Sequence, residues 1–140
     1  MLKHLSSKYH PVDIFIDREG NWHVHGKRHE PHRILSQIDV VLNALHGEYG
    51  EDGKVQELLE AHGMPFSGSK KIPSAMAMNK VMTKRLALRH KIKTPSFKVL
   101  DSELATDIAR VANYLYSSFP QPSIIKPLSK GSSIGVVLVR

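Results

Sequence analysis

Residues 130–135 combine the residue types that bind phosphate. Two glycines flank the hydroxyls of Ser132 and Ser133. Successive backbone N–H groups in such a turn form a cradle for an anion, and serine hydroxyls add donors. Lys126, a few residues upstream, can add a point charge to the same ligand. The segment lacks the Gly-x-x-x-x-Gly-Lys-Ser/Thr pattern of a P-loop, so it predicts either another kind of phosphate site or a plain glycine-serine hairpin.

A second stretch, residues 38–53, joins an apolar run to an acidic turn. Its residues 40–45 are mainly apolar with β-branched residues at the start, which is typical of a strand buried on both faces in a parallel sheet. The turn that follows alternates three glycines with three carboxylates. Ligands bind to open α/β sheets at such turns, outside the carboxyl ends of the strands. The same composition suits a plain connection, so both readings stay open at this point.

Four histidines close in sequence raise the question of a metal site: His23, His25, His29 and His32. Their spacing would allow metal binding. However, the chain contains no cysteine, and a proline and three basic residues lie among the histidines. This favours a solvated loop over a metal site.

Several elements must position these residues. Alternation over residues 12–17 and 22–25, with a turn signal between them, predicts a β-hairpin. Helical spacing predicts helices over residues 54–62, 75–90 and 102–117, with Gly63 ending the first and Ser102 capping the last. Short apolar runs predict strands at residues 96–100, 123–127 and 136–140. Lys80 and Lys84 lie one turn apart on a helix face that would by default be solvated.

The composition of the 140 residues sets broad limits. A hydrophobic content of 41% is enough for an ordinary domain with a core. The net charge of +7 comes from scattered residues with few aromatics between them, which makes nucleic-acid binding a minor alternative. The absence of cysteine and of any long apolar run favours a cytoplasmic protein with no membrane contact.

Five motifs, in order, resemble those of D-alanine–D-alanine ligases in the ATP-grasp superfamily. They are His46-Gly47-x-x-Gly50-Glu51-Asp52-Gly53-x-x-Gln56, Phe66-Ser67-Gly68-Ser69, Ser74-Ala75-Met76-Ala77-Met78-Asn79-Lys80 with Thr83-Lys84, Ile125-Lys126-Pro127, and Gly131-Ser132-Ser133-Ile134-Gly135. The resemblance runs from about residue 38 to the C-terminus, with a weaker fit over residues 12–26. Five ordered motifs are far more specific than any one of them.

The resemblance implies an α/β fold with two parts. Residues 1–93 would form a Rossmann-like, parallel-sheet amino-terminal domain, and residues 94–140 the truncated start of an ATP-grasp α+β domain. The implied activity is the ATP-dependent joining of two D-alanines through a D-alanyl phosphate, for peptidoglycan precursor synthesis. ATP and Mg²⁺ would be required, and the full-length protein would be a homodimer.

The resemblance also implies roles for individual residues. The lysines would hold the ATP phosphates, the glycine-serine loop would cover the triphosphate, one serine would face the reacting substrate, and the turn would line the D-alanine pocket. The lysines are Lys80 and Lys126, and Gly131, Ser133 and Gly135 belong to the loop. The serine that faces the substrate is Ser132, and His46 and Gly47 belong to the turn. Phosphoryl transfer needs positioned positive charge and N–H donors, which these residues can supply.

The sequence departs from the family pattern at several points. Asn79 stands where the family usually has Asp, and Glu57 where it usually has Gly. The family's first strand, with a substrate-binding glutamate, has no match before Val12. The adenine pocket and the magnesium ligands would lie beyond Arg140, so we expect this chain alone to be inactive. The alternatives are a non-catalytic nucleotide- or partner-binding remnant and half of a split ligase.

Overall fold

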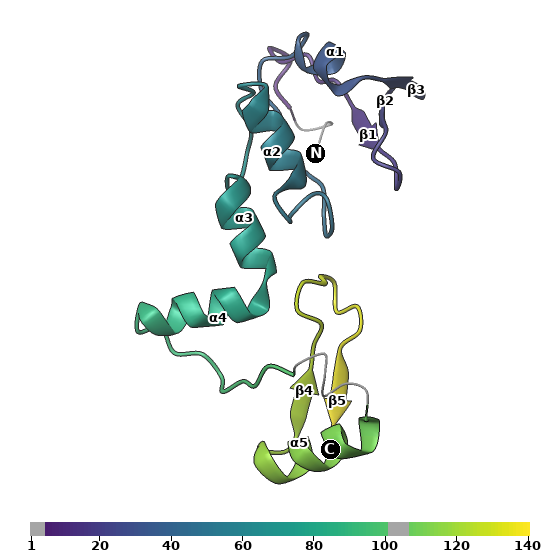
Figure 1. Ribbon diagram of the computed structural model, residues 1–140. Coiled ribbons are helices and arrows are strands. Elements are labelled where there is room, and N and C mark those ends of the chain that lie inside the picture. Colours follow the sequence, from purple (N-terminus) through teal and green to yellow (C-terminus); the bar gives the residue numbers. More distant parts are fainter. Residues whose placement is uncertain (1–4, 101–106) are drawn as a thin grey trace. The chain divides into compact units, whose positions relative to one another are not determined.

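A computed structural model describes residues 5–100 and 107–140, and the chain divides into two compact units with mixed helices and strands (Figure 1). Unit 1 comprises Met1–Asn43 and Leu58–Gly68. Unit 2 comprises Ala44–Glu57 and Ser69–Arg140. None of the described helices is long and apolar enough to cross a membrane.

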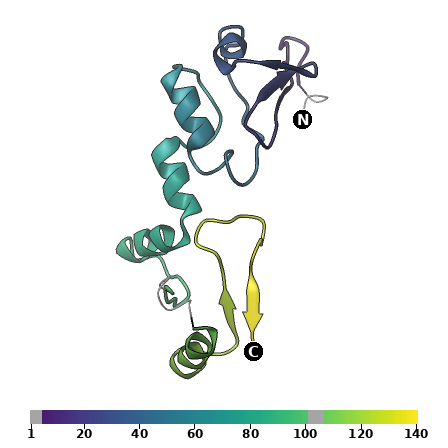
Figure 2. The same ribbon diagram turned by 45° about the vertical axis from the view of Figure 1, so that its right-hand side comes forward.

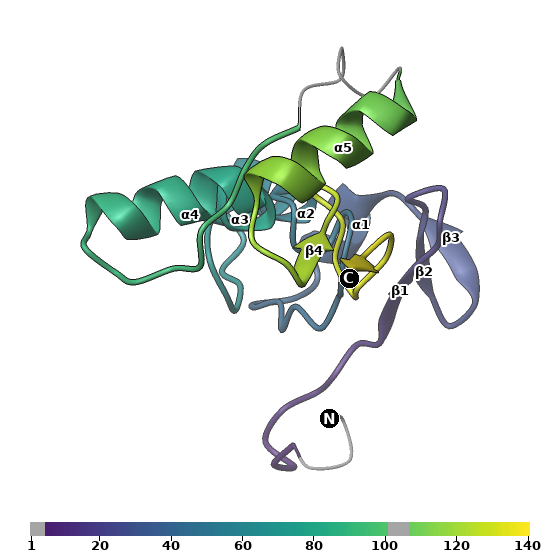
Figure 3. The ribbon, with the colours of Figure 1, turned by 90° about the horizontal axis from the view of Figure 1, so that it is seen from below.

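Unit 1 contains a three-stranded antiparallel sheet of β1 (Ile14–Ile16), β2 (Trp22–Val24) and β3 (Lys27–His29), in that order. The strands lie side by side in Figure 3. Ile14 pairs with Val24 and Ile16 with Trp22, so the predicted hairpin is confirmed. The prediction of a solvated loop after it was incomplete. Its exposed basic residues form β3, and the five-residue helix α1 (Pro31–Leu35) follows.

The buried side chains of unit 1 are few. They are Trp22 on β2, Ile34 and Leu35 on α1, and Leu59, which is fully buried. One face of β1 and β2 is better buried than the other, since Phe15 is 65% exposed. Alternation in the sequence indicates this difference because successive strand residues point to opposite faces.

The predicted buried strand at residues 40–45 is not present. Val41 makes an isolated parallel bridge to Phe66, in which its N–H donates to the carbonyl of Pro65 and its carbonyl accepts from the N–H of Ser67, each at 2.9 Å. Val40 and Leu42 are 62% and 53% exposed, so burial on both faces was wrong here. Both sheets of the described residues are antiparallel, and the bridge is the parallel pairing within them.

Helix α2 (Lys54–Ala61) confirms the helix predicted at residues 54–62. Val55 and Leu59 are its buried apolar residues, four positions apart on one face. Gly63 follows with a φ of 62°, and the N–H of Met64 donates to the carbonyl of Leu59 at 2.9 Å. Gly63 therefore ends the helix in the left-handed conformation that glycine adopts most readily.

The helix predicted at residues 75–90 is instead two helices, α3 (Lys71–Met78) and α4 (Lys80–Arg89), which run in different directions in Figure 1. Asn79 separates them in an extended conformation, with ψ at 106°. Its side chain accepts hydrogen bonds from the N–H groups of Val81 and Met82, at 3.1 and 3.0 Å. Asparagine is a strong N-cap residue, which explains why the helix breaks here. Asn79 thereby makes Lys80 the first residue of α4.

Residues 107–140 contain helix α5 (Ile108–Ser118) and the hairpin of β4 (Ser123–Ile125) and β5 (Val137–Val139). Asp107 caps α5, whereas the predicted cap Ser102 lies outside the described residues. Ser123 pairs with Val139 and Ile125 with Val137. Figure 2 shows the long connection between the two strands. Residues 96–100 form no strand, which contradicts the prediction.

Candidate functional site

The predicted phosphate loop is the connection between β4 and β5. Ser132 and Ser133 have φ angles of 49° and 58°, and Gly135 has 71°. Left-handed conformations are uncommon for residues with a Cβ, and adjacent ones concentrate strain in a short segment. Two turn hydrogen bonds hold it, from the N–H of Ile134 to the carbonyl of Gly131 and from Val136 to Ser133. Strained conformations of this kind cluster at ligand-binding sites, which supports the predicted role of the loop.

Gly135 closes the loop against the end of β4. A Cβ at this position would lie 2.7 Å from Cγ of Pro127, closer than side chains approach one another. The positive φ and this contact both call for glycine. The family resemblance assigned Gly135 to ATP binding, and its contact with Pro127 indicates a structural reason for the residue as well.

Lys80 is held at this loop by two hydrogen bonds. Its Nζ donates to the carbonyl of Lys130 at 2.7 Å, and its N–H donates to the carbonyl of Leu128 at 3.1 Å. The structure thus brings the first predicted phosphate lysine to the predicted phosphate loop. The default prediction was that this helix face is solvated, whereas the Lys80 side chain contacts the loop.

Lys126 is exposed at the end of β4, and its side chain makes no hydrogen bond or ion pair with other described residues. It lies directly before Pro127, at one end of the loop. An exposed ammonium group in this position can reach an anion in the loop without first breaking a contact.

The turn that carries His46 and Gly47 is tightly folded. The N–H of Glu51 donates to the carbonyl of Gly47 at 2.9 Å, and the Glu51 carboxylate accepts from the N–H of Gly47. A Cβ on Gly50 would lie 2.4 Å from Cβ of Leu45, so this glycine is required by close packing. His46 is exposed. The acidic residue Glu51 therefore stabilises the turn that presents His46 and Gly47.

Gln56 anchors the turn to α2. Its side chain is 3% exposed, and its Nε2 donates to the carbonyl of Gly50 at 2.7 Å. Asp52 lies at the start of the same helix, where burial raises the pKa of its carboxyl. The hydrogen bonds from the N–H groups of Lys54 and Tyr49 and the charge of Lys54 oppose this effect and outweigh it, so the net pKa lies below its ordinary value. Asp52 is thus a helix-start residue, and its ion-pair partner is Lys54 at 3.2 Å.

The turn and the loop meet through two residues that sequence reasoning assigned no role. Nζ of Lys130 lies 2.9 Å from Oε2 of Glu48. The hydrogen bond to Lys130, assisted by its positive charge, holds the pKa of the Glu48 carboxyl below its ordinary value. The one available signal was charge: the turn is acidic and the loop begins with a lysine. Charge alone does not say which of several exposed pairs will form.

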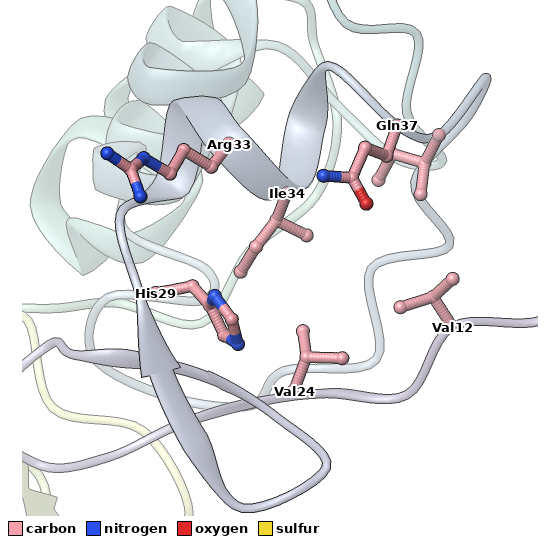
Figure 4. Close-up of a pocket in the computed structure, with 7 residues that line it drawn as sticks. Val12, Val24, His29, Arg33, Ile34 and Gln37 are labelled. Carbon is pink, nitrogen blue, oxygen red and sulfur yellow. The ribbon is translucent and has the colours of Figure 1, made fainter.

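Each unit contains a cavity. In unit 1, a cavity of about 310 Å³ is lined by residues that include His29, Ile34 and Val24, whose side chains turn toward the same space in Figure 4. It contains none of the predicted site residues. In unit 2, an open cavity of about 330 Å³ is lined mainly by methionines and isoleucine of α3 and α4, and by Asn79 and Ser129. Two of its lining residues, Asn79 and Ser129, directly precede Lys80 and Lys130 in the sequence.

Of the four closely spaced histidines, His23 contacts a carboxylate. His23 Nε2 lies 2.8 Å from Oδ2 of Asp17, and this hydrogen bond keeps the pKa of the Asp17 carboxyl far below its ordinary value. Within residues 5–100 and 107–140, no three His, Cys, Asp or Glu side chains are grouped closely enough to hold a metal ion. The described carboxylates thus do not fit a Mg²⁺ site.

Lys84, which also belongs to the motif around Lys80, has a structural contact. Its Nζ donates to Oγ1 of Thr94 and to the carbonyl of Pro95, both at 3.0 Å, and lies 5.3 Å from the ring centre of Phe97. The prediction of a solvated lysine was therefore wrong, and Lys84 fixes the segment after α4.

The comparisons with known proteins find similarity to D-alanine–D-alanine ligases. Residues 25–69 match the family model described as the D-ala D-ala ligase N-terminus. The chain is 45% identical over 103 residues to a D-alanine–D-alanine ligase of Moorella thermoacetica. The matched stretch covers 73% of this chain and 33% of that protein. The chain thus spans about a third of the length of this relative.

Solved structures give the same result. The D-alanine–D-alanine ligase of Helicobacter pylori matches 91% of this chain and 33% of its own, with a TM-score of 0.61 and 30% identity. The VanG D-Ala:D-Ser ligase of Enterococcus faecalis matches 98% of this chain and 48% of its own, with a TM-score of 0.75. At 22% identity this second match shows the fold alone. The family-model match and the sequence relative confirm the predicted resemblance to the amino-terminal portion of this family.

Proposed function

We propose, from the similarity of this chain to the amino-terminal part of D-alanine–D-alanine ligases, that it contributes the phosphate loop and part of the D-alanine pocket of such an enzyme. The full-length protein would join two D-alanines in an ATP-dependent reaction through a D-alanyl phosphate. That activity would serve peptidoglycan precursor synthesis in the cytoplasm.

One observation carries this proposal. Lys80, from the start of α4, donates to the backbone of the loop between β4 and β5, and the turn with His46 and Gly47 contacts the same loop. Three segments distant in sequence, each with a family motif, thus meet in one place. A plain glycine-serine hairpin would not require these contacts.

The donor groups fit a triphosphate. Lys80 and Lys126 offer ammonium groups, and Gly131, Ser133 and Gly135 belong to a loop with strained backbone whose N–H groups can donate to an anion. Lys80 would exchange its bond with the Lys130 carbonyl for a phosphate oxygen. Ser132 would face the reacting substrate, and His46 and Gly47 would line its pocket.

Mg²⁺ does not fit the described residues, because their carboxylates form ion pairs and helix-start contacts rather than a cluster. We therefore assign no metal ligand and no metal-dependent step to this chain. Without charge neutralisation between the phosphates, we expect the chain alone to form no dipeptide.

The remaining assignments rest on the family resemblance. They are a Rossmann-like parallel sheet in residues 1–93, the start of an ATP-grasp domain in residues 94–140, and a homodimer of the full-length protein. The parallel bridge between Val41 and Phe66 supports the first of them. A non-catalytic remnant is not favoured, because the matches are to ligases.

Nucleotide binding to this chain tests the proposal. We expect a non-hydrolysable ATP analogue to shift the backbone NMR signals of residues 130–135 and Lys80. Lys126→Ala should weaken binding about tenfold or more, because a charge-assisted hydrogen bond contributes on the order of 1.5–3 kcal/mol.

Lys93→Ala is the matched control, because Lys93 is an exposed lysine in the same unit without a described contact. Lys84→Ala would be a poorer control, since it removes the bonds to Thr94 and Pro95. Equal affinities of the Lys126 and Lys93 variants, or shifts confined to other residues, would contradict the proposal.

A further inference from the structure

The contact between Glu48 and Lys130 joins two segments that otherwise belong to separate elements. Glu48 lies in the turn before α2, and Lys130 lies in the loop between β4 and β5. Beside the ion pair the two backbones approach closely, since a Cβ on Gly131 would lie 3.9 Å from Cα of Gly47. The ion pair therefore lies at a place where predicted substrate and phosphate residues are already adjacent.

The two partners differ in how firmly their backbones are held. The turn around Glu48 is fixed by the hydrogen bonds between Gly47 and Glu51, and by the buried side chain of Gln56. The loop around Lys130 has two turn hydrogen bonds of its own, and its described polar contacts with other elements are those with Lys80 and Glu48. Glu48 is thus a fixed point to which a less constrained loop is attached.

The geometry points to Glu48 and Lys130 as positioning residues, whose ion pair holds the loop of residues 129–135 over the turn with His46 and Gly47 before any ligand binds. Their effect on ligand binding rests on the proposed function. The contact between loop and turn does not.

The expected strength of the contact is modest. The side chains of Lys130 and Glu48 are 49% and 64% exposed, and exposed ion pairs are weak and screened by salt. Such a pair changes a local opening equilibrium by about two- to fivefold. An effect of this size is measurable by hydrogen exchange and small enough to leave the fold intact.

Hydrogen exchange of residues 129–135 in the 140-residue chain tests this inference. We expect Glu48→Gln and Lys130→Gln each to speed exchange of the loop about two- to fivefold at low salt. The double charge reversal, Glu48→Lys with Lys130→Glu, should restore slow exchange. At 1 M NaCl the wild-type loop should exchange like the single variants.

Lys71→Gln is the matched control. Lys71 forms an ion pair of the same exposed kind with Glu57, in the same unit but outside the loop. It should leave loop exchange unchanged. Loop exchange that is the same in wild type and both single variants, or that the charge reversal fails to restore, would overturn the inference.

A second measurement separates this inference from the proposed function. If the loop is held in a binding-competent position, Glu48→Gln should also weaken an ATP analogue by about two- to fivefold. Wild-type chain that binds no analogue would remove the proposed function, and the exchange data alone would then decide whether the pair holds the loop. If hydrogen exchange of the loop is faster in Glu48→Gln but the affinity for the analogue is unchanged, the pair does not position the ligand site.

Discussion

Two of the antiparallel hairpins in the described residues, the pair β1 and β2 and the pair β4 and β5, are stabilised in different ways. In the first, Asp17 accepts hydrogen bonds from the N–H groups of Glu19 and Asn21 and from the side chains of Asn21 and His23, so one residue closes the turn between β1 and β2. In the second, the connection between β4 and β5 is held by Lys80 and Glu48, which come from other segments.

The first hairpin is thus held by its own residues, whereas the connection in the second depends on residues from other segments. The first has a buried tryptophan on β2 and a short turn with its own hydrogen bonds. The second exposes both faces, since Ile124, Val137 and Leu138 are each more than half exposed. A loop that relies on distant contacts can exchange them for a ligand, whereas a turn closed on itself cannot do so without unfolding.

The largest expected effect concerns the burial that supports the first hairpin. Trp22→Ala should destabilise it by about 3–5 kcal/mol, because the side chain is 2% exposed and leaves a cavity. Native-state hydrogen exchange of the β2 amides measures this loss. Phe15→Ala, which removes a 65% exposed aromatic side chain from the neighbouring strand, should change it by less than about 0.5 kcal/mol. Similar losses in the two variants would mean that burial does not hold this hairpin.

A glycine in each hairpin gives the next comparison. Gly135→Ala in the second should cost about 2–4 kcal/mol, because Ala is strained at a φ of 71° and its Cβ would clash with Pro127. Gly20→Ala in the first, at a φ of 83° with no atom within 4 Å, should cost only about 1–2 kcal/mol. Exchange rates of the strand amides next to each glycine measure both. An Ala at position 135 that is tolerated as well as one at 20 would show that the loop is not closed against Pro127.

The smallest effect is the pH dependence of the Asp17 turn. Because hydrogen bonds in the folded state lower the pKa of this carboxyl, the stability it contributes is present above its ordinary pKa near 3.8 and is lost as the pH falls toward the lowered value. Thermal midpoints of the first hairpin should fall between pH 5 and 2 in the wild type and fall less in Asp17→Asn. Asp13→Asn is the control, since Asp13 accepts no hydrogen bond from other described side chains. A variant at position 17 with the wild-type pH profile would exclude Asp17 as the source.

Local patterns predicted local structure well. Alternation located the first hairpin, helical spacing located α2, and Gly63 marked its end. Each depends on interactions within a few residues, which are present in the sequence itself. The strand expected at residues 40–45 failed because a buried strand needs neighbours on both sides, and the described chain supplies one bridge at Val41.

The site was predicted through family motifs rather than through physical pattern. Those motifs placed Lys80 with the loop of residues 131–135, and the structure brings the two together through the Lys130 carbonyl. Glu48 and Lys130 were missed because an exposed ion pair depends on the relative position of two loops, which neither loop encodes alone. The roles of His46, Ser132 and Lys126 stay predictions for the binding experiments.

The break at Asn79 has a consequence for how this protein tolerates insertions and deletions. In a continuous helix, each added or removed residue rotates every later side chain by about 100° around the axis. Here α4 begins anew from its own cap, and Thr83 ties it back to the carbonyls of Met76, Ala77 and Asn79. The angular phase of Lys80 is therefore set by Asn79 and not by the length of α3. A residue added to or removed from α3 should therefore leave Lys80 as the first residue of α4.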